Sequence, residues 1–154
     1  MAHKISEVRC KMVSVEVILD LRHRVLRAGM RAEAACFDGD HEPDTQHFAA
    51  YFDGGIDPVG CASFMLRPYN RIPAWQLRGM ATEERYRGRK IGAHLLEWAV
   101  MNLKDEPDYA YVELLWCNAR EPAVPFYERN GWRCVSGRFV IDDAGPHYKM
   151  IKSI

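Results

Sequence analysis

Residues 85–100, RYRGRKIGAHLLEWAV, place five basic residues around two glycines and then continue as an apolar helical pattern. The first turn of a helix leaves backbone N–H groups unpaired, and the helix dipole adds partial positive charge there. Gly88 and Gly92 would allow a tight turn and a close approach to a ligand. These features favour a phosphate or pyrophosphate site. An ordinary solvated helix start is the alternative, although the dipole disfavours basic residues at that end.

Composition and charge exclude several other classes of protein. Lys+Arg and Asp+Glu number 21 each, so the chain as a whole has no electrostatic reason to bind nucleic acid or an anionic membrane. Neither the P-loop nor the dinucleotide fingerprint occurs. No apolar run approaches the ~20 residues of a membrane helix. The N-terminal MAHKISEVRC has no signal-peptide core, and five cysteines without a CxxC pair favour reduced thiols. We therefore expect a cytoplasmic protein.

The elements that must position the basic stretch follow from hydrophobic periodicity. The 154 residues correspond to one domain, 1–154. Helices are expected over 15–27, capped by Ser14, over 90–103 and, as a short helix, over 121–131. Residues 28–46 form a loop or a short second helix. Strand-like runs lie at 7–14, 47–53, 58–68, 74–82 and 109–117, and a hairpin at 132–151. This order predicts an α/β domain with a mixed sheet.

Two segments at a characteristic spacing, LRGMATEERYRGRKIGAHLL and FYERNGW, resemble the GNAT superfamily of acyl-CoA-dependent N-acetyltransferases. The family's first motif, Q/R-x-x-G-x-G/A, aligns with Arg87, Gly88, Arg89, Lys90, Ile91 and Gly92, with Lys90 in place of the first motif glycine. Its second motif aligns with Arg120, Ala123, Phe126, Tyr127, Gly131 and Trp132. There Arg120 replaces the usual Asn, and Asn118 lies two residues earlier. The resemblance covers roughly residues 59–151. It implies a GNAT fold, with a central mixed, mostly antiparallel sheet flanked by helices.

The resemblance also implies how acetyl-CoA would bind as cosubstrate. The loop Arg87–Gly92 would grip its pyrophosphate. The backbone of Met80, Ala81 and Thr82 in the fourth strand would pair with the pantetheine arm as an added strand would, and Asn118 is a further candidate contact. Gly79 marks either a bulge that splays the fourth and fifth strands or a close-packing position.

The catalytic candidates are Tyr127 and Glu113. By resemblance Tyr127 is the general acid that protonates the departing thiolate, and the alternative is a core aromatic with its hydroxyl at the edge. Glu113 lies among Val112, Leu114 and Leu115, where a carboxylate is costly to bury unless it is used or paired. A lysine-like ammonium with a pKa near ~10.4 must lose a proton before it attacks, so Glu113 is the candidate base. A structural salt bridge is its alternative.

Other chemically capable residues give weaker patterns. His147 and Tyr148 could reach the substrate end of the site, or His147 could be a hydrogen-bonded strand residue. His41 and His47 stand near four carboxylates, but their spacing matches no metal motif, so we expect no metal and a solvated acidic loop. Cys117 is expected in the core rather than as a nucleophile.

The sequence therefore predicts an acetyl-CoA-dependent N-acetyltransferase that transfers directly to a primary amine of a small molecule or peptide. The acidic residues 38–44 could attract a cationic acceptor. A non-catalytic CoA-binding module is the alternative, whereas a nucleic-acid binder is disfavoured because the chain is neutral. From the sequence we expect no membrane partner, and a homodimer is possible.

Overall fold

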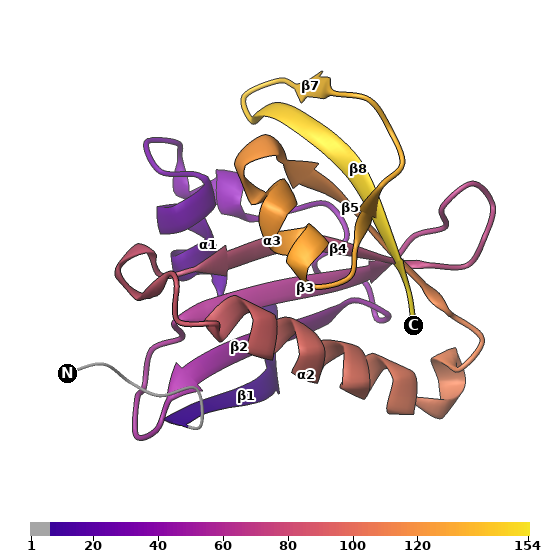
Figure 1. The fold of residues 1–154 in the computed structure, drawn as a ribbon. Helices are drawn as coiled ribbons and strands as arrows, with labels where there is room; N and C mark the ends of the chain where they lie inside the picture. Colours follow the sequence, from indigo (N-terminus) through magenta and orange to yellow (C-terminus); the bar gives the residue numbers. More distant parts are fainter. Residues whose placement is uncertain (1–6) are drawn as a thin grey trace.

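A computed structural model describes residues 7–154 as one sheet with helices on both faces (Figure 1). The strands are β1 (Val8–Val13), β2 (Gln46–Phe52), β3 (Gly60–Leu66), β4 (Trp75–Thr82), β5 (Leu114–Arg120), β6 (Arg133–Cys134), β7 (Phe139–Ile141) and β8 (Gly145–Ser153). The α-helices are α1 (Leu19–Leu26), α2 (Ile91–Asp105) and α3 (Val124–Arg129). The expectation about a signal peptide falls largely on residues 1–6, which lie outside the described part.

The sheet is mixed and mostly antiparallel, as the sequence predicted. Its strands run in the order β1-β2-β3-β4-β5-β8-β6, and β7 pairs with β8. Among the residues described, β4 and β5 form the one parallel pair. Because parallel neighbours need a crossover connection, α2 carries the chain from the end of β4 back to the start of β5.

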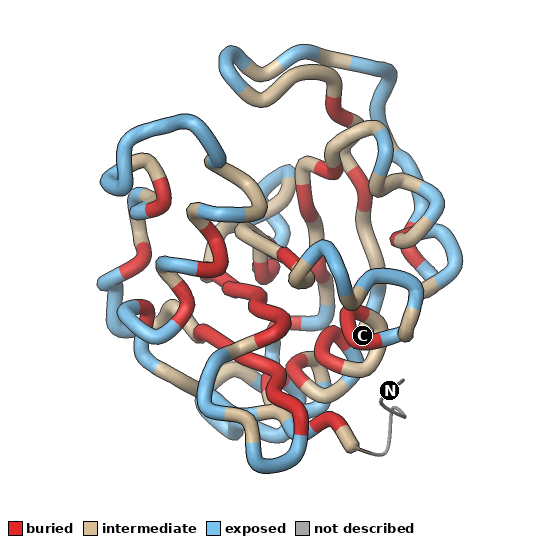
Figure 2. Tube along the Cα trace, turned by 90° about the vertical axis from the view of Figure 1, so that its left-hand side faces the viewer, coloured by how far each residue is buried: buried red, intermediate tan, exposed pale blue. Residues whose placement is uncertain are grey.

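The two faces of the sheet carry different helices. Side chains alternate along a strand, so neighbouring residues of β2 point to opposite faces. Phe48 packs in one cluster with Leu95 of α2 and Tyr127 of α3, whereas Ala49 packs in another with Leu21 of α1. Helices α2 and α3 therefore cover one face, and α1 covers the other. In Figure 2 most buried positions lie in the interior of the trace, and the outer loops are largely exposed.

The parallel pair separates soon after it begins. Trp75 pairs with Leu115 and Gln76 with Trp116, and no further pairing joins these two strands in the described chain. The facing edges of both strands therefore carry backbone N–H and C=O groups without a strand partner from this point on. This separation makes an opening in the middle of the sheet.

A bulge in β4 accompanies the separation. On β3, Cys61 faces Ala81 but Ser63 faces Arg78, so β4 has one residue more than its neighbour across this interval. Gly79 lies in the bulge with a φ of 63°, a backbone conformation that glycine adopts without steric cost. The expectation of a bulge at Gly79 is confirmed.

A buried polar network anchors the loop after α1 to the sheet. The Arg22 guanidinium donates to Asp40 at 2.7 and 3.2 Å and to Ser63 Oγ at 2.8 Å. The His47 ring is 2.6 Å from Ser63 Oγ and 2.9 Å from the Asp40 carbonyl oxygen. Arg22 also stacks on the ring of Phe37, 4.1 Å from its centre. Because the ion pair is buried and hydrogen-bonded to several elements, it fixes the loop in one position.

Most elements lie where the sequence placed them, with differences that include the following three. The helix expected over 15–27 is divided into a 3-10 turn, Val15–Val17, and α1, and the Ser14 side chain makes no capping hydrogen bond. The strand expected from residue 109 begins at Leu114, after a 3-10 turn at Pro107–Tyr109. The segment 28–46 holds a 3-10 turn, Ala32–Ala35, in place of a second helix, and its last residue begins β2. Within the described residues, no helix has the length and apolar character to span a bilayer.

Candidate active site

A groove of about 1220 Å³ occupies the opening between β4 and β5. Residues from both faces of the sheet line it, so it passes through the sheet from the side of α2 and α3 to the side of α1. The structure brings to this groove all the sequence-predicted site residues except Arg89 and Glu113: Met80, Ala81, Thr82, Arg87, Gly88, Lys90, Ile91, Gly92, Asn118 and Tyr127.

The basic loop ends at the N-terminus of α2, on one wall of the groove. The first hydrogen bond of this helix runs from the His94 N–H to the Lys90 carbonyl at 3.0 Å. The N–H groups of Ile91, Gly92 and Ala93 therefore have no acceptor within the helix. All three residues line the groove, so the helix N-terminus can bind an anion there.

The backbone of the loop explains the departure from the motif at Lys90. Lys90 has a φ of 62° and precedes the first helical residue. A glycine adopts this left-handed conformation without cost, so lysine keeps the motif's backbone geometry at an expense of about 1 kcal/mol. Arg89 does not line the groove. Its guanidinium lies 5.5 Å from the centre of the Tyr86 ring, and its Nη1 is buried without a hydrogen-bond partner in the described chain.

Two features of the strand edges suit an extended ligand. The groove-facing edges of β4 and β5 lack strand partners beyond Gln76 and Trp116, so a ligand with amide groups can hydrogen-bond there as an added strand. Asn118 lines the same groove, and its Oδ1 is buried with no partner among residues 7–154. A buried amide oxygen without a hydrogen bond costs about 1–3 kcal/mol, which a ligand N–H donor would recover.

Tyr127 is held by aromatic packing at the wall of the groove. It is 7% exposed, and its ring makes edge contacts with Phe126 and Trp132 at centroid distances of 5.2 and 5.3 Å. Burial, with a smaller contribution from Cys117, raises the pKa of the Tyr127 hydroxyl well above its usual value. The phenol is therefore protonated at neutral pH and can donate a hydrogen bond or a proton.

Cys117 belongs to the core, as expected. It is 2% exposed, and burial raises the pKa of its thiol far above the usual range. A thiol that stays protonated is a poor nucleophile, so the groove offers no cysteine for a covalent step at this position.

Glu113 does not belong to the groove. The sequence predicted a buried glutamate in the central strand, but Glu113 precedes β5 and is exposed. The residues of β5 that line the groove, 117–120, lie at the other end of the strand. The prediction of a buried Glu113 is wrong, because the chain has not yet entered the strand at this position and leaves the side chain in solvent.

His147 in β8 reaches the groove, whereas Tyr148 does not line it. His147 is 4% exposed, and its Nδ1 lies 2.7 Å from the carbonyl oxygen of Gly145. A carbonyl can only accept, so Nδ1 carries the hydrogen. Nε2 is then the ring nitrogen that this hydrogen bond leaves available.

Sequence reasoning did not predict that Arg27, Arg78 and Arg120 would meet at the α1 end of the groove. Arg27 and Arg78 lie over the Phe37 ring, and Arg120 shares the Leu26 carbonyl oxygen with Arg27. These residues lie far apart in the sequence and come together only through the fold. A basic patch is the only sequence signal that could have found them, and Arg78 and Arg120 stand singly in their strands.

The acidic segment 38–44 is not the free negative surface that the sequence predicted. Asp40 is buried and paired with Arg22, with 2.7 Å between the closest atoms. Glu42 pairs with Arg67 at 2.7 Å, and Asp44 accepts a hydrogen bond from a tyrosine hydroxyl. The expectation of a solvated acidic loop is therefore wrong for Asp40, which is buried, whereas Glu42 is exposed and forms its ion pair at the surface.

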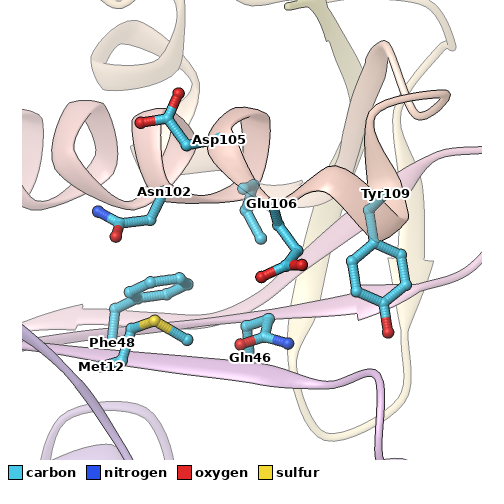
Figure 3. Close-up of a pocket in the computed structure, with 8 residues that line it drawn as sticks. Met12, Gln46, Phe48, Asn102, Asp105, Glu106 and Tyr109 are labelled. Carbon is cyan, nitrogen blue, oxygen red and sulfur yellow. The ribbon is translucent and has the colours of Figure 1, made fainter.

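A second, smaller depression of about 240 Å³ lies between the C-terminal end of α2 and strands β1 and β2 (Figure 3). Glu106 points toward the strands there, and Asp105 points away from them. None of the sequence-predicted site residues lines this depression. Across residues 7–154, no group of three or more metal-ligating side chains is arranged to hold a metal ion.

Comparison with known proteins decides the family. The model of the acetyltransferase (GNAT) domain matches residues 43–134. An uncharacterized N-acetyltransferase of Bacillus subtilis, YitI, is 32% identical over 145 residues, which cover 94% of this chain and 95% of that protein. The chain belongs to the GNAT acetyltransferase family. It is accordingly an N-acetyltransferase that transfers an acetyl group to an amine.

Solved structures share the GNAT fold over nearly the whole chain. Escherichia coli ElaA has a TM-score of 0.71 at 18% identity and covers 94% of this chain and 99% of its own. An aminoglycoside 6'-N-acetyltransferase in complex with coenzyme A has a TM-score of 0.72 at 15% identity, with 94% and 96% covered. At these identities the two neighbours show that the fold is shared.

Proposed function

We propose that the groove between β4 and β5 binds acetyl-CoA and transfers its acetyl group directly to a primary amine of a small molecule or peptide. The N–H groups of Ile91, Gly92 and Ala93 hold the pyrophosphate, with Arg87 and Lys90 supplying charge beside them. The free edges of β4, including Met80, and of β5 receive the pantetheine amides. The orphaned Oδ1 of Asn118 supports this fit, since an amide N–H would satisfy it.

In this proposal acetyl-CoA supplies an activated thioester, and the chain supplies position and proton transfer. Tyr127 lines the groove and delivers its phenolic proton to the departing sulfur. His147 takes the proton of the attacking amine at Nε2. His147 replaces Glu113 in this role because it lines the groove, whereas Glu113 does not.

We further propose that the protein is cytoplasmic, as expected from the sequence. Cys36 and Cys134 are exposed free thiols, and such thiols persist in a reducing compartment.

One observation carries the proposal: the parallel strands part after two consecutive residue pairs, and the resulting groove joins Tyr127 to the N-terminus of α2. The test is thiol release from acetyl-CoA with a panel of amines, with the acetylated product identified by mass. Amine-dependent release by the wild-type protein is expected, and the His147→Gln variant should lose about 10²–10⁴-fold in kcat.

The competing function is a GNAT module that binds CoA without catalysis. Binding of acetyl-CoA with no amine-dependent thiol release across the panel would favour that alternative. Equal turnover by wild type and His147→Gln would instead keep the transferase and remove His147 as the base.

A further inference from the structure

Three guanidinium groups from distant parts of the chain meet at the α1 end of the groove. Arg78 of β4 lies over the Phe37 ring at 4.7 Å from its centre, and Arg27, which follows α1, lies at 5.1 Å. Arg120 at the end of β5 and Arg27 both donate to the carbonyl oxygen of Leu26, each at 3.1 Å. Shared contacts therefore place the three groups in one cluster.

Within the described part of the chain, the cluster has no ion-pair partner. Across residues 7–154, no carboxylate lies within ion-pair distance of Arg27, Arg78 or Arg120. A guanidinium has five N–H donors, and the backbone oxygen of Leu26 uses one from Arg27 and one from Arg120. All three arginines line the open groove, where further donors are available to a ligand.

The arrangement costs electrostatic free energy as it stands. Burial, followed by the charges of Arg120, Arg78 and Arg22, lowers the pKa of Arg27. Burial also lowers the pKa of Arg78, partly offset by Asp40 and Asp38. Asp40 is already engaged with Arg22, and Asp38 is exposed, so neither neutralises the cluster. A bound anion would compensate this concentration of positive charge.

The cluster is separate from the expected pyrophosphate site. Residues of β5 alternate between faces, and Cys117 belongs to the core on the α2 side, so Arg120 projects on the opposite, α1 side. The basic loop leads directly into α2 and therefore lies on the α2 side of the sheet. The proposed pyrophosphate site is on the α2 side of the sheet. The cluster is on the α1 side, from which the amine acceptor can approach the groove.

We propose that the amine acceptor carries an anionic group, a carboxylate or a phosphate, which Arg27, Arg78 and Arg120 bind while its amine faces the thioester. This inference rests on the proposed function and names its substrate class. Planar guanidinium groups bind carboxylate and phosphate oxygens in pairs, so they fix the orientation of the acceptor as well as its charge. The same arginines would repel the cationic acceptor considered from the sequence.

The test compares anionic amine acceptors with neutral ones, and 3-aminopropanamide is the neutral reference for both 3-aminopropanoate and 2-aminoethyl phosphate. The probes are 3-aminopropanoate, 3-aminopropanamide and 2-aminoethyl phosphate, together with free amino acids and their carboxamides. Thiol release gives kcat/KM for each, and the measured quantity is the ratio of the anionic acceptor to its neutral partner. An anionic group that gains charge-assisted hydrogen bonds should raise this ratio about 10- to 100-fold.

Variants then assign the preference to the cluster. Arg78→Met should return the ratio toward one, and Arg78→Lys should restore part of it, because lysine keeps the charge but not the paired donors. Arg27→Met provides a second variant should Arg78→Met fold poorly. Arg31→Met is the matched control, since Arg31 is a surface arginine whose side chain is 89% exposed. Because the ratio is taken within one protein sample, partial unfolding does not change it.

Each outcome has a definite meaning. Preference for carboxylate or phosphate acceptors that falls in Arg78→Met but not in Arg31→Met supports the inference, and the two anionic arms show which group is bound. Equal transfer to anionic and neutral amines, or preference for polycations, overturns it while the proposed acetyltransferase function stands. Failure to acetylate any amine overturns the proposed function and this inference with it.

Discussion

At the scale of single residues, Tyr127 combines a fixed position with a retained proton. Its ring packs against Phe126 and Trp132, and burial keeps its hydroxyl protonated. A phenylalanine would preserve both ring contacts, since the two side chains differ only by the hydroxyl. Packing and proton donation can therefore be separated at this position.

We predict that Tyr127→Phe lowers kcat while the affinity for acetyl-CoA and the melting temperature stay nearly unchanged. Loss of a general acid typically costs 10²–10⁴-fold, or somewhat less where water substitutes. Steady-state kinetics with a melting curve and calorimetry on the same variant provide the measurement. A purely structural tyrosine would instead show a lower melting temperature, with binding and turnover declining together.

The pH dependence of turnover provides a second check on Tyr127. A general acid must be protonated, so activity is lost as the pH rises through its pKa. Because burial raises that pKa above its usual value of about 10, kcat should show no loss from Tyr127 below about pH 10. We would measure kcat between about pH 7 and 10 in wild type and in Tyr127→Phe. A fall in this window that is present only in wild type would contradict a raised pKa.

Individual residues also show where sequence reasoning fails. The apolar neighbours of Glu113 indicated a buried strand, but β5 begins one residue later, and the exposed side chain needs no partner. The sequence around His147 indicated its proposed role only weakly, because that role depends on a hydrogen bond to the Gly145 carbonyl oxygen that the sequence does not reveal. Tyr127 was predicted at the groove because its motif is local and continuous, and its catalytic role stays a prediction.

At the scale of elements, we expect acetyl-CoA binding by the loop before α2 to depend on close packing at Gly92 as well as on positive charge. A Cβ atom at Gly92 would lie 3.4 Å from the Phe126 ring and 3.4 Å from Thr82 Oγ1, so these side chains leave little room for a larger residue at this position. Arg85 stacks on Tyr86 at 4.9 Å from the ring centre and does not line the groove.

Replacing Gly92 with Val should therefore weaken acetyl-CoA binding more than replacing Arg85 with Ala. The branched side chain would crowd Phe126 and Thr82, which both line the groove, whereas loss of Arg85 removes only a distant, screened charge. Isothermal calorimetry on both variants measures the difference. Equal losses of affinity would show that the loop binds through general positive charge and not through the close approach at Gly92.

The bulge in β4 gives a prediction about stability. A Cβ at Gly79 would lie 2.8 Å from Arg22 Nε and 3.0 Å from the Phe37 ring, and the φ of 63° adds strain for any other residue. Gly54 has a similar φ of 76°, but a Cβ added there would meet no atom within 4 Å. Gly54 is therefore a matched control for the backbone strain alone.

We predict that Gly79→Ala lowers the free energy of unfolding by about 1–3 kcal/mol more than Gly54→Ala, because the added methyl group overpacks a crowded position. Chemical denaturation of the two variants provides the comparison. The same loss in both would mean that the Arg22 and Phe37 side chains move aside without cost.

At the scale of the whole molecule, the sequence predicts the framework better than the acceptor end of the site. Element order, the mixed sheet and the basic helix start follow from local periodicity and continuous motifs. The buried Arg22–Asp40 pair and the arginines around Phe37 join residues that are distant in sequence, so no local pattern contains them. The acidic loop was misjudged for the same reason, because its partners lie on other elements.

The central claim is that the separation of β4 and β5 creates the acetyl-CoA site, and amide hydrogen exchange with and without acetyl-CoA tests it most directly. Binding should slow exchange over residues 77–93 and 117–120, which include the groove lining, and leave unchanged the end of α2 that borders the depression in Figure 3. Protection confined to other segments, or none at millimolar acetyl-CoA, would contradict this assignment.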